Sequence, residues 1–165
     1  DECQEEMKKA GLRQNHQINS CHKCGVPVRL MSKKSERYAN DAGSFRTMFE
    51  VTAKAINDGK KVLIKTTMGY RVFYKVEKHL SKDTILMMIE ADKITDNLSL
   101  ITEEFNALLS IERPVLHVAL KSEKLKEIMG YNTAFVKYPD DGFSILLGVE
   151  LKKLGFEYVG YEVAD

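Results

Sequence analysis

Short apolar segments alternate with amphipathic helical segments from Ser44 to the end of the chain, and this alternation constrains the fold most. The apolar segments of strand length read "KKVLIKTT", "GYRVFYKV", "TILMMIEA", "RPVLHVAL", "TAFVKY" and "FEYVGYEV". They are rich in β-branched and aromatic residues, which favour strands. Short, apolar strands separated by helices are typical of one sheet covered by helices, and not of an all-β design. We therefore predict an α/β or α+β fold, built on a twisted mixed sheet with flanking helices.

The clearest helix follows Asp141, which is suited to an N-cap, and ends at Gly155. Its apolar stripe consists of Phe143, Leu146, Leu147, Leu151 and Leu154. Further helices are predicted from Ser44 to residues 57–59, from Thr102, and from Ser122 to Met129. The strand at 113–120 carries His117 among apolar neighbours, which favours a hydrogen-bonded core or edge side chain over a catalytic base.

All three cysteines lie in the first 24 residues, within or upstream of the segment "RQNHQINSCHKCG". Cys21 and Cys24 form a C-x-x-C pair, and Cys3 lies upstream. A redox site of the thioredoxin kind would place such a pair at the start of a helix after a strand, whereas polar residues precede this pair. A disulfide between Cys21 and Cys24 would close only a tiny loop and stabilise the fold little.

A zinc site suits this segment better, because two thiolates on a tight turn followed by glycine resemble a zinc knuckle. Tetrahedral zinc needs four ligands, so we expect Cys21, Cys24, Cys3 and either His16 or a residue upstream of Asp1. The segment offers no carboxylate base, which favours a structural zinc ion. We predict a partial zinc finger or ribbon over residues 1–30, an irregular linker over 31–43, and an α/β domain over 44–165.

Composition excludes several functions. The 25 Lys and Arg residues nearly balance the 24 Asp and Glu residues, so no electrostatic footprint for nucleic acid is present. No apolar run approaches the roughly 18 residues that span a bilayer, and an odd cysteine count favours a reducing cytoplasm. We find no P-loop, dinucleotide fingerprint or Ser/His/Asp order. The abrupt start at Asp-Glu-Cys indicates a fragment of a longer protein.

The order of these pieces resembles a known family. "RQNHQINSCHKCG" is similar to the last zinc finger of the hydrogenase-maturation carbamoyltransferases (the HypF family), in which the zinc fingers precede a YrdC-like domain. "AINDGKKVLIKTTMGYRVFYK" resembles the helix–glycine–strand segment of that domain, with Lys65, Gly69 and Tyr70 at matching positions. The resemblance implies a YrdC-like fold for the domain.

The resemblance continues in order along the chain. "SKDTILMMI" places Lys82 on a family lysine, and "ITEEFNALLSIERPVLHV" matches the family at Ser110, Arg113 and Pro114. "ILLGVELKKLGFEYV" resembles the late helix and strand of the same domain. Each motif is weak alone, and the co-linear set carries the resemblance.

The family's YrdC-like domain binds ATP and makes a carbamoyl adenylate, which leads to the cyanide ligands of nickel–iron hydrogenase. The resemblance therefore implies nucleotide- or anion-binding roles for Lys65, Thr66, Thr67, Gly69, Tyr70, Lys82 and Arg113. The sequence departs from the family in three places. Gly69 alone remains of the glycine-rich turn, the basic cluster between the two strands is absent, and "VGYEVAD" replaces a Thr-Ser-Gly-Asn turn.

We therefore expect a cytoplasmic accessory factor of nickel–iron hydrogenase maturation. It would carry a structural zinc ion and use a degenerate YrdC-like domain to bind other maturation proteins. One alternative is an active domain that forms a carbamoyl or related acyl adenylate from ATP and Mg²⁺. A second is an RNA-binding domain of the tRNA-modifying YrdC class, which the balanced charge disfavours.

Overall fold

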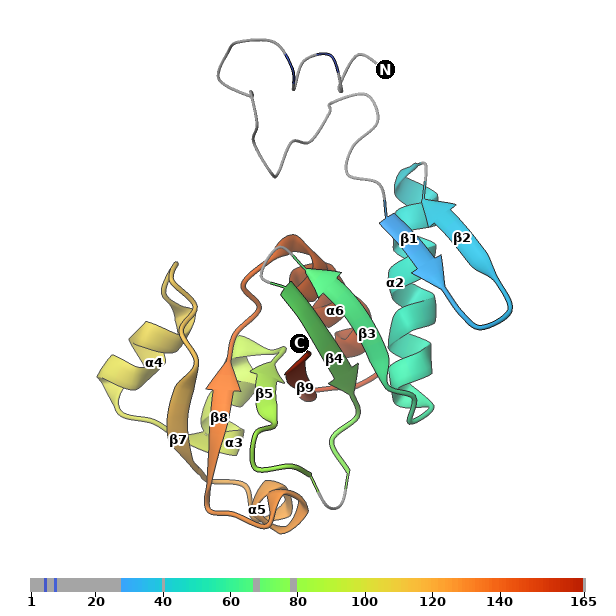
Figure 1. The fold of residues 1–165 in the computed structure, drawn as a ribbon. Helices are drawn as coiled ribbons and strands as arrows, with labels where there is room; N and C mark the ends of the chain where they lie inside the picture. The colour runs from blue at the N-terminus through green and yellow to red at the C-terminus, as the bar shows by residue number, and fades with distance from the viewer. Residues whose placement is uncertain are drawn as a thin grey trace. The chain divides into compact units, whose positions relative to one another are not determined.

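The computed structural model describes residues 28–39, 41–66, 69–77 and 80–164, together with residues 5 and 8. The chain divides into two compact units, Asp1–Met48 and Phe49–Asp165. The division falls within the sequence of helix α2 (Ala42–Asn57), which Figure 1 labels. Among the described residues, no helix is both long enough and apolar enough to cross a bilayer.

The first unit contains an antiparallel hairpin of β1 (Val28–Met31) and β2 (Glu36–Ala39). Ser32 closes its turn, because its N–H donates to the Ser35 carbonyl at 2.8 Å and its Oγ accepts the Ser35 N–H at 3.1 Å. The prediction of an irregular segment over residues 31–43 is therefore wrong for this hairpin. The polar composition of this segment did not indicate the two short strands. Their turn is stabilised by hydrogen bonds between the Ser32 side chain and the backbone.

Asp41, and not Ser44, caps the start of α2. The Ser44 N–H donates to Asp41 Oδ1 at 2.9 Å, and the Asp41 N–H donates back to Ser44 Oγ at 3.1 Å. This reciprocal pair satisfies two backbone donors, so the helix begins earlier than expected. Its end agrees with the prediction, because Gly59 takes a left-handed φ of 79° directly after the last turn.

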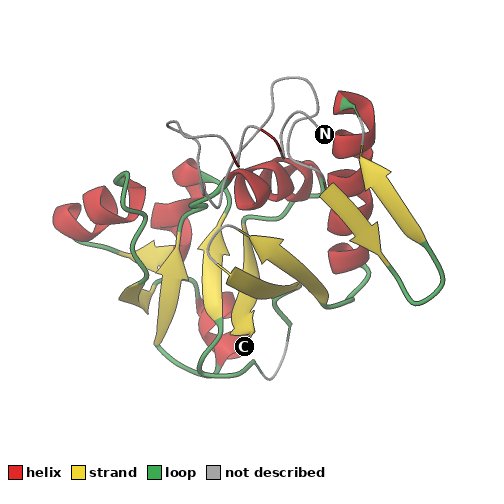
Figure 2. Cartoon of the chain, turned by 45° about the horizontal axis from the view of Figure 1, so that its top comes forward, coloured by secondary structure: helices red, strands yellow, loops and turns green. Residues whose placement is uncertain are grey.

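The second unit is built on one sheet in the order β3-β4-β9-β5-β8-β7-β6. Figure 1 labels these strands except β6, and Figure 2 shows strands in yellow. The strands of the sheet are β3 (Val62–Thr66), β4 (Gly69–Tyr74), β5 (Ile85–Met88), β6 (Leu98–Ser99), β7 (Leu116–Leu120), β8 (Thr133–Lys137) and β9 (Tyr158–Ala164). Among the described strands, β5 and β8 pair in parallel and the other neighbours pair antiparallel. The prediction of a mixed sheet with flanking helices is confirmed.

The helices of this unit connect its strands. They are η1 (Ala91–Lys93), α3 (Ile94–Asn97), α4 (Thr102–Leu109), α5 (Glu123–Met129) and α6 (Gly142–Lys153). Asp141 caps α6 as predicted, and Ser122, the predicted first residue of α5, is its N-cap. Thr102 does not cap α4, which instead begins after Ile101, whose N–H donates to Glu104 Oε2 at 3.0 Å. The sequence did not indicate η1, α3 or β6, because such short elements carry no periodicity.

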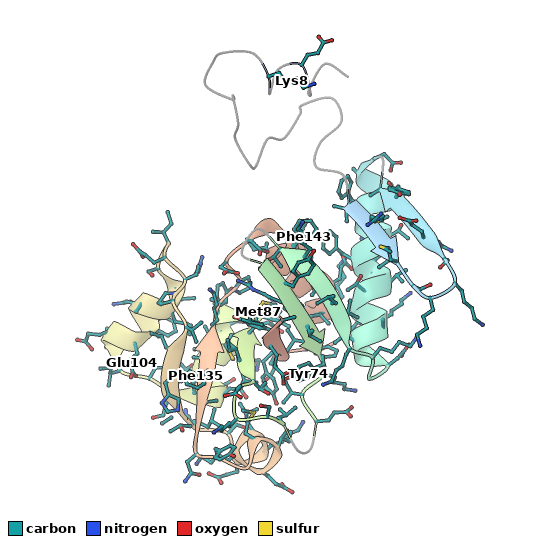
Figure 3. The ribbon with its side chains drawn as sticks, viewed as in Figure 1. Lys8, Tyr74, Met87, Glu104, Phe135 and Phe143 are labelled. Carbon is teal, nitrogen blue, oxygen red and sulfur yellow. The ribbon has the colours of Figure 1, made fainter. Side chains whose placement is uncertain are left out.

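Two hydrophobic cores cover the two faces of the sheet. The first contains Phe49, Ala53 and Ile56 of α2, Leu147 and Leu151 of α6, and Phe73, Met87, Val159 and Tyr161 of the sheet. The second packs β5, β7 and β8 against α3, α4 and α5. Met87, marked in Figure 3, is 1% exposed, and its neighbour Leu86 is fully buried on the opposite face. Strand β5 is therefore the centre of the fold, which explains its unbroken apolar run.

Candidate functional site

Two of the predicted anion-binding residues lie side by side on the β3–β4 hairpin. Lys65 pairs across the strands with Tyr70, and Lys65 Nζ lies 5.8 Å from the centroid of the Tyr70 ring. Both side chains are exposed to solvent. The hairpin thus presents one accessible cation and one accessible ring.

The neighbouring Thr66 and Gly69 serve the turn of this hairpin. Thr66 is only 6% exposed, and its hydroxyl donates to the Gly69 carbonyl at 3.0 Å. Gly69 has a φ of 105°, a conformation that favours glycine. The predicted Thr67 lies outside the described residues. The Thr66 hydroxyl is therefore engaged inside the fold.

Lys82 lies on the turn before β5, away from this hairpin. The strand order places β3 three positions from β5, which corresponds to about 14 Å at the usual strand spacing. Lys82 lines a cavity of about 340 Å³ together with His117 and Phe135. His117 is exposed and packs on Phe135, with the ring centroids 4.7 Å apart, so it is not a core histidine. Figure 3 marks Phe135 on β8.

Arg113 makes its contacts within the protein. Its Nη1 donates to the Leu109 carbonyl at the end of α4, at 2.9 Å. The guanidinium also lies over the Tyr138 ring, 4.9 Å from its centroid. Arg113 has a φ of 47°, which is uncommon for a residue with a side chain. The Arg113 side chain therefore binds the C-terminal end of α4.

The predicted zinc ligands Cys3, His16, Cys21 and Cys24 all lie outside the described residues. Within the described part of the chain, no group of three or more His, Cys, Asp and Glu side chains could bind a metal ion. The zinc site therefore stays a prediction about the N-terminal segment.

The most buried charged groups of the domain were not predicted from the sequence. Arg71 on β4 binds Asp140 with both nitrogens of its guanidinium, at 2.7 and 2.8 Å, and Lys137 Nζ lies 2.7 Å from the same carboxylate. The side chains of Arg71 and Asp140 are 6% and 8% exposed. Burial alone would raise the pKa of Asp140, but the hydrogen bonds and charges of Arg71 and Lys137 hold that pKa well below its usual range.

Asp141 completes this cluster at the start of α6. Its Oδ1 accepts the N–H of Ser144 at 2.7 Å and the Ser144 hydroxyl at 2.8 Å. Its Oδ2 is buried and has no hydrogen-bond partner in the described part of the chain, and Arg71 Nη1 lies 3.8 Å away. The helix terminus is thus occupied by the protein's own carboxylate, at a position where other proteins bind phosphate. Two cations and two carboxylates cancel in charge.

Solved structures that resemble the chain include two YrdC-like proteins. One is full-length HypF in the phosphate- and nucleotide-bound form, with 23% identity, a TM-score of 0.59, and coverage of 69% of this chain and 20% of that chain. The other is E. coli YciO, with 13% identity, a TM-score of 0.54, and coverage of 70% of this chain and 63% of that chain. The fold is YrdC-like.

The chain spans about a fifth of the HypF chain and less than two thirds of YciO. No protein-family model matches the sequence, and no curated protein matches it. At these identities the likeness establishes the fold of the YrdC-like domain and leaves its activity to be proposed.

A further buried polar group of the YrdC-like domain is the Tyr74 hydroxyl, on the face opposite Arg71. It lies 2.7 Å from Thr84 Oγ1 and donates to Glu162 Oε1 at 2.7 Å. Burial raises the pKa of Tyr74, so the hydroxyl stays protonated as a donor at neutral pH. The group joins β4 and β9 to Thr84, the residue before β5, which is a structural role. Figure 3 marks Tyr74.

Proposed function

We propose that this chain is an accessory binding component of nickel–iron hydrogenase maturation. Its YrdC-like domain contacts other maturation proteins, and a zinc ion stabilises the N-terminal segment. Two findings support the proposal. The fold resembles that of full-length HypF, and the co-linear motifs from the cysteines to the last strand follow the order of the same family.

Arg71 and Arg113 both interact with other residues of the protein, which favours a protein-binding role over nucleotide-dependent catalysis. A site for a triphosphate needs several cations and backbone donors that converge on one position. In this domain Asp140 occupies Arg71, while the Leu109 carbonyl and the Tyr138 ring occupy Arg113. The predicted anion-binding lysines, Lys65 and Lys82, lie on separate parts of the sheet.

Titration calorimetry with ATP and Mg²⁺ tests whether the domain binds the nucleotide that the adenylate-forming alternative requires. We expect no binding at micromolar concentrations. Micromolar affinity that Lys65→Ala abolishes, while Lys124→Ala leaves it unchanged, would contradict the proposal and favour the adenylate-forming alternative. Lys124 is a matched control because it is an exposed lysine on α5, outside the β3–β4 hairpin.

Deletion of the gene tests the biological role. We expect hydrogenase activity to fall in the deletion strain and to return with the wild-type gene. Growth with added nickel separates a defect in ligand synthesis from one in nickel supply. Unchanged hydrogenase activity would contradict the maturation role. Retention of RNA at low salt would instead support the tRNA-modifying alternative.

A further inference from the structure

Strand β3 forms one end of the seven-stranded sheet. It pairs with β4 along one edge, from Val62 opposite Phe73 to Thr66 opposite Gly69. Among the described residues, no strand pairs with its other edge, and no hydrogen bond between backbone groups reaches residues 61–65 from outside the hairpin. Such an edge offers a row of backbone donors and acceptors to another strand.

The register shows which backbone groups face this open edge. Thr66 and Gly69 are paired across the strands with only two residues between them in the sequence. In such a hairpin, the pair next to the turn is the one whose two backbone groups hydrogen-bond to each other in both directions. The alternation of an antiparallel ladder then directs the backbone groups of Ile64 and Val62 toward β4. It directs those of Leu63 and Lys65 away from the sheet.

The same alternation separates the side chains of β3. Val62 and Ile64 pack against the first core. Leu63 and Lys65 point to the opposite face, where Leu63 is 58% exposed and its cross-strand neighbour Val72 is half-buried. Tyr70 extends this apolar surface and is 43% exposed. The edge therefore has an accessible apolar centre next to its open backbone groups.

The hairpin itself is rich in cations. Residues 59–76 contain Lys60, Lys61, Lys65, Arg71 and Lys75 and no acidic residue, and Lys75 lies 3.9 Å from Glu77. Asp140 neutralises Arg71, whereas Lys61 and Lys65 flank Leu63 at alternate positions on the same face. The whole chain carries a formal charge of only +1, so this hairpin is a local concentration of cations.

We propose that β3 binds an extended, acidic segment of a partner protein, which adds to the sheet as a further strand. The segment would present an apolar side chain to Leu63 and carboxylates to Lys61 and Lys65. The backbone groups of Leu63 and Lys65 supply the main-chain hydrogen bonds of this recognition mode. The inference rests on the binding role proposed above, and it names the surface and the chemistry of the partner.

Charge excludes a second copy of the chain as the preferred occupant. Two β3 strands paired antiparallel about Leu63 would place Lys61 of each copy directly opposite Lys65 of the other. Like charges directly opposite one another on a sheet destabilise the pair. An acidic strand converts the same two positions into favourable cross-strand pairs.

The test uses the full chain and two synthetic peptides, Thr-Glu-Thr-Val-Thr-Glu-Thr and its counterpart with Lys in place of Glu. Amide NMR spectra are recorded at up to millimolar peptide. We expect the acidic peptide to shift the Leu63 and Lys65 amides and slow their hydrogen exchange, and the basic peptide to bind at least tenfold more weakly. Absence of these shifts, or shifts elsewhere only, would overturn the proposal.

Variants test the charge and the backbone separately. Lys61→Glu with Lys65→Glu should reverse the preference, so that the basic peptide binds at least tenfold more tightly than the acidic one. Leu63→Pro removes an outward N–H and should abolish binding, whereas Leu63→Thr retains it and should weaken binding less. Circular dichroism confirms that each variant is folded. Equal binding by Leu63→Pro and Leu63→Thr would overturn the proposal.

Analytical ultracentrifugation tests whether a second copy of the chain, and not a partner segment, binds to β3. A dimer of the wild-type chain that Leu63→Pro dissociates would show that β3 pairs with a second copy, and would overturn the proposal. The peptide experiment contains no hydrogenase component, so its result is independent of the deletion strain. Unchanged hydrogenase activity with intact peptide binding would reject the maturation role alone.

Discussion

The guanidinium of Arg71 binds both carboxylate oxygens of Asp140, a residue 69 positions later in the chain. The pair joins β4 to the segment that leads into α6. It lies over the ring of Tyr161, whose centroid is 5.2 Å from the Arg71 guanidinium carbon. Burial raises the pKa of Tyr161 to about 12, so this ring stays neutral beneath the pair.

Removal of one partner should destabilise the domain strongly. Arg71→Met leaves the Asp140 carboxylate buried with Lys137 as its remaining cation, which should cost about 3 kcal/mol in the free energy of unfolding. Urea denaturation measures this cost. Arg71→Met combined with Asp140→Leu should cost less than the sum of the two single substitutions, because the two side chains bind each other. A cost equal to that sum would show that the pair is not coupled.

The same carboxylate should make stability depend on acid. The pKa of Asp140 is lower in the folded state than the unfolded value of about 3.9. Its contribution is therefore complete above that value and is lost as pH falls toward the folded pKa. We expect the difference in free energy of unfolding between the wild type and Asp140→Asn to shrink from pH 5 to pH 2.5. A constant difference across this range would contradict the assignment.

Gly160 should not tolerate a side chain. A Cβ at this position would lie 2.9 Å from Tyr74 Cε2 and 3.3 Å from Thr84 Cγ2. Gly160→Ala should therefore cost about 1–3 kcal/mol. Gly148→Ala in α6 is the matched control, because its nearest contact is Ile89 Cγ2 at 3.9 Å and alanine favours helices by about 1 kcal/mol. Thermal unfolding should rank Gly148→Ala above the wild type and Gly160→Ala below it.

Substitutions of Arg113 should distinguish the effect of backbone strain on stability from the effect of lost side-chain contacts. Arg113→Ala loses the contacts with Leu109 and Tyr138 and keeps a positive φ. Arg113→Gly loses the same contacts and relieves the strain, which for a left-handed residue is about 1–2 kcal/mol. We expect both variants to be less stable than the wild type, with Arg113→Gly the more stable of the two. The reverse order of melting temperatures would show that the backbone relaxes after substitution.

The N-terminal segment should contain about one zinc ion per chain. Elemental analysis of freshly reduced protein measures the content, and Cys21→Ser with Cys24→Ser should remove the metal. His22→Ala is the control, because adjacent residues rarely both reach one ion and His22 is expected to face solvent. Acidification should also release zinc, since thiolate ligands bind it only when deprotonated. Zinc-free wild-type protein would reject the site.

Local patterns were sufficient for several elements of this fold. Asp141 caps α6 and α5 ends at Met129 as predicted, because each signal involves residues within one helical turn. The apolar run of residues 84–91 correctly indicated strand β5, and the structure shows that this strand is buried on both faces. The short elements β1, β2 and β6 were not indicated, since a few residues carry too little periodicity to separate a strand from a loop.

The sequence by itself determined the alternation of helices and strands, the mixed sheet, and the positions of most helix ends. Only the tertiary structure decided how the charged residues are used. It directed Arg71 to Asp140 and Arg113 to the end of α4, and left Lys61 and Lys65 on an open edge. The reason is physical. Helix caps and strand patterns depend on neighbours along the chain, whereas the partner of a buried charge depends on which distant segments the sheet brings together.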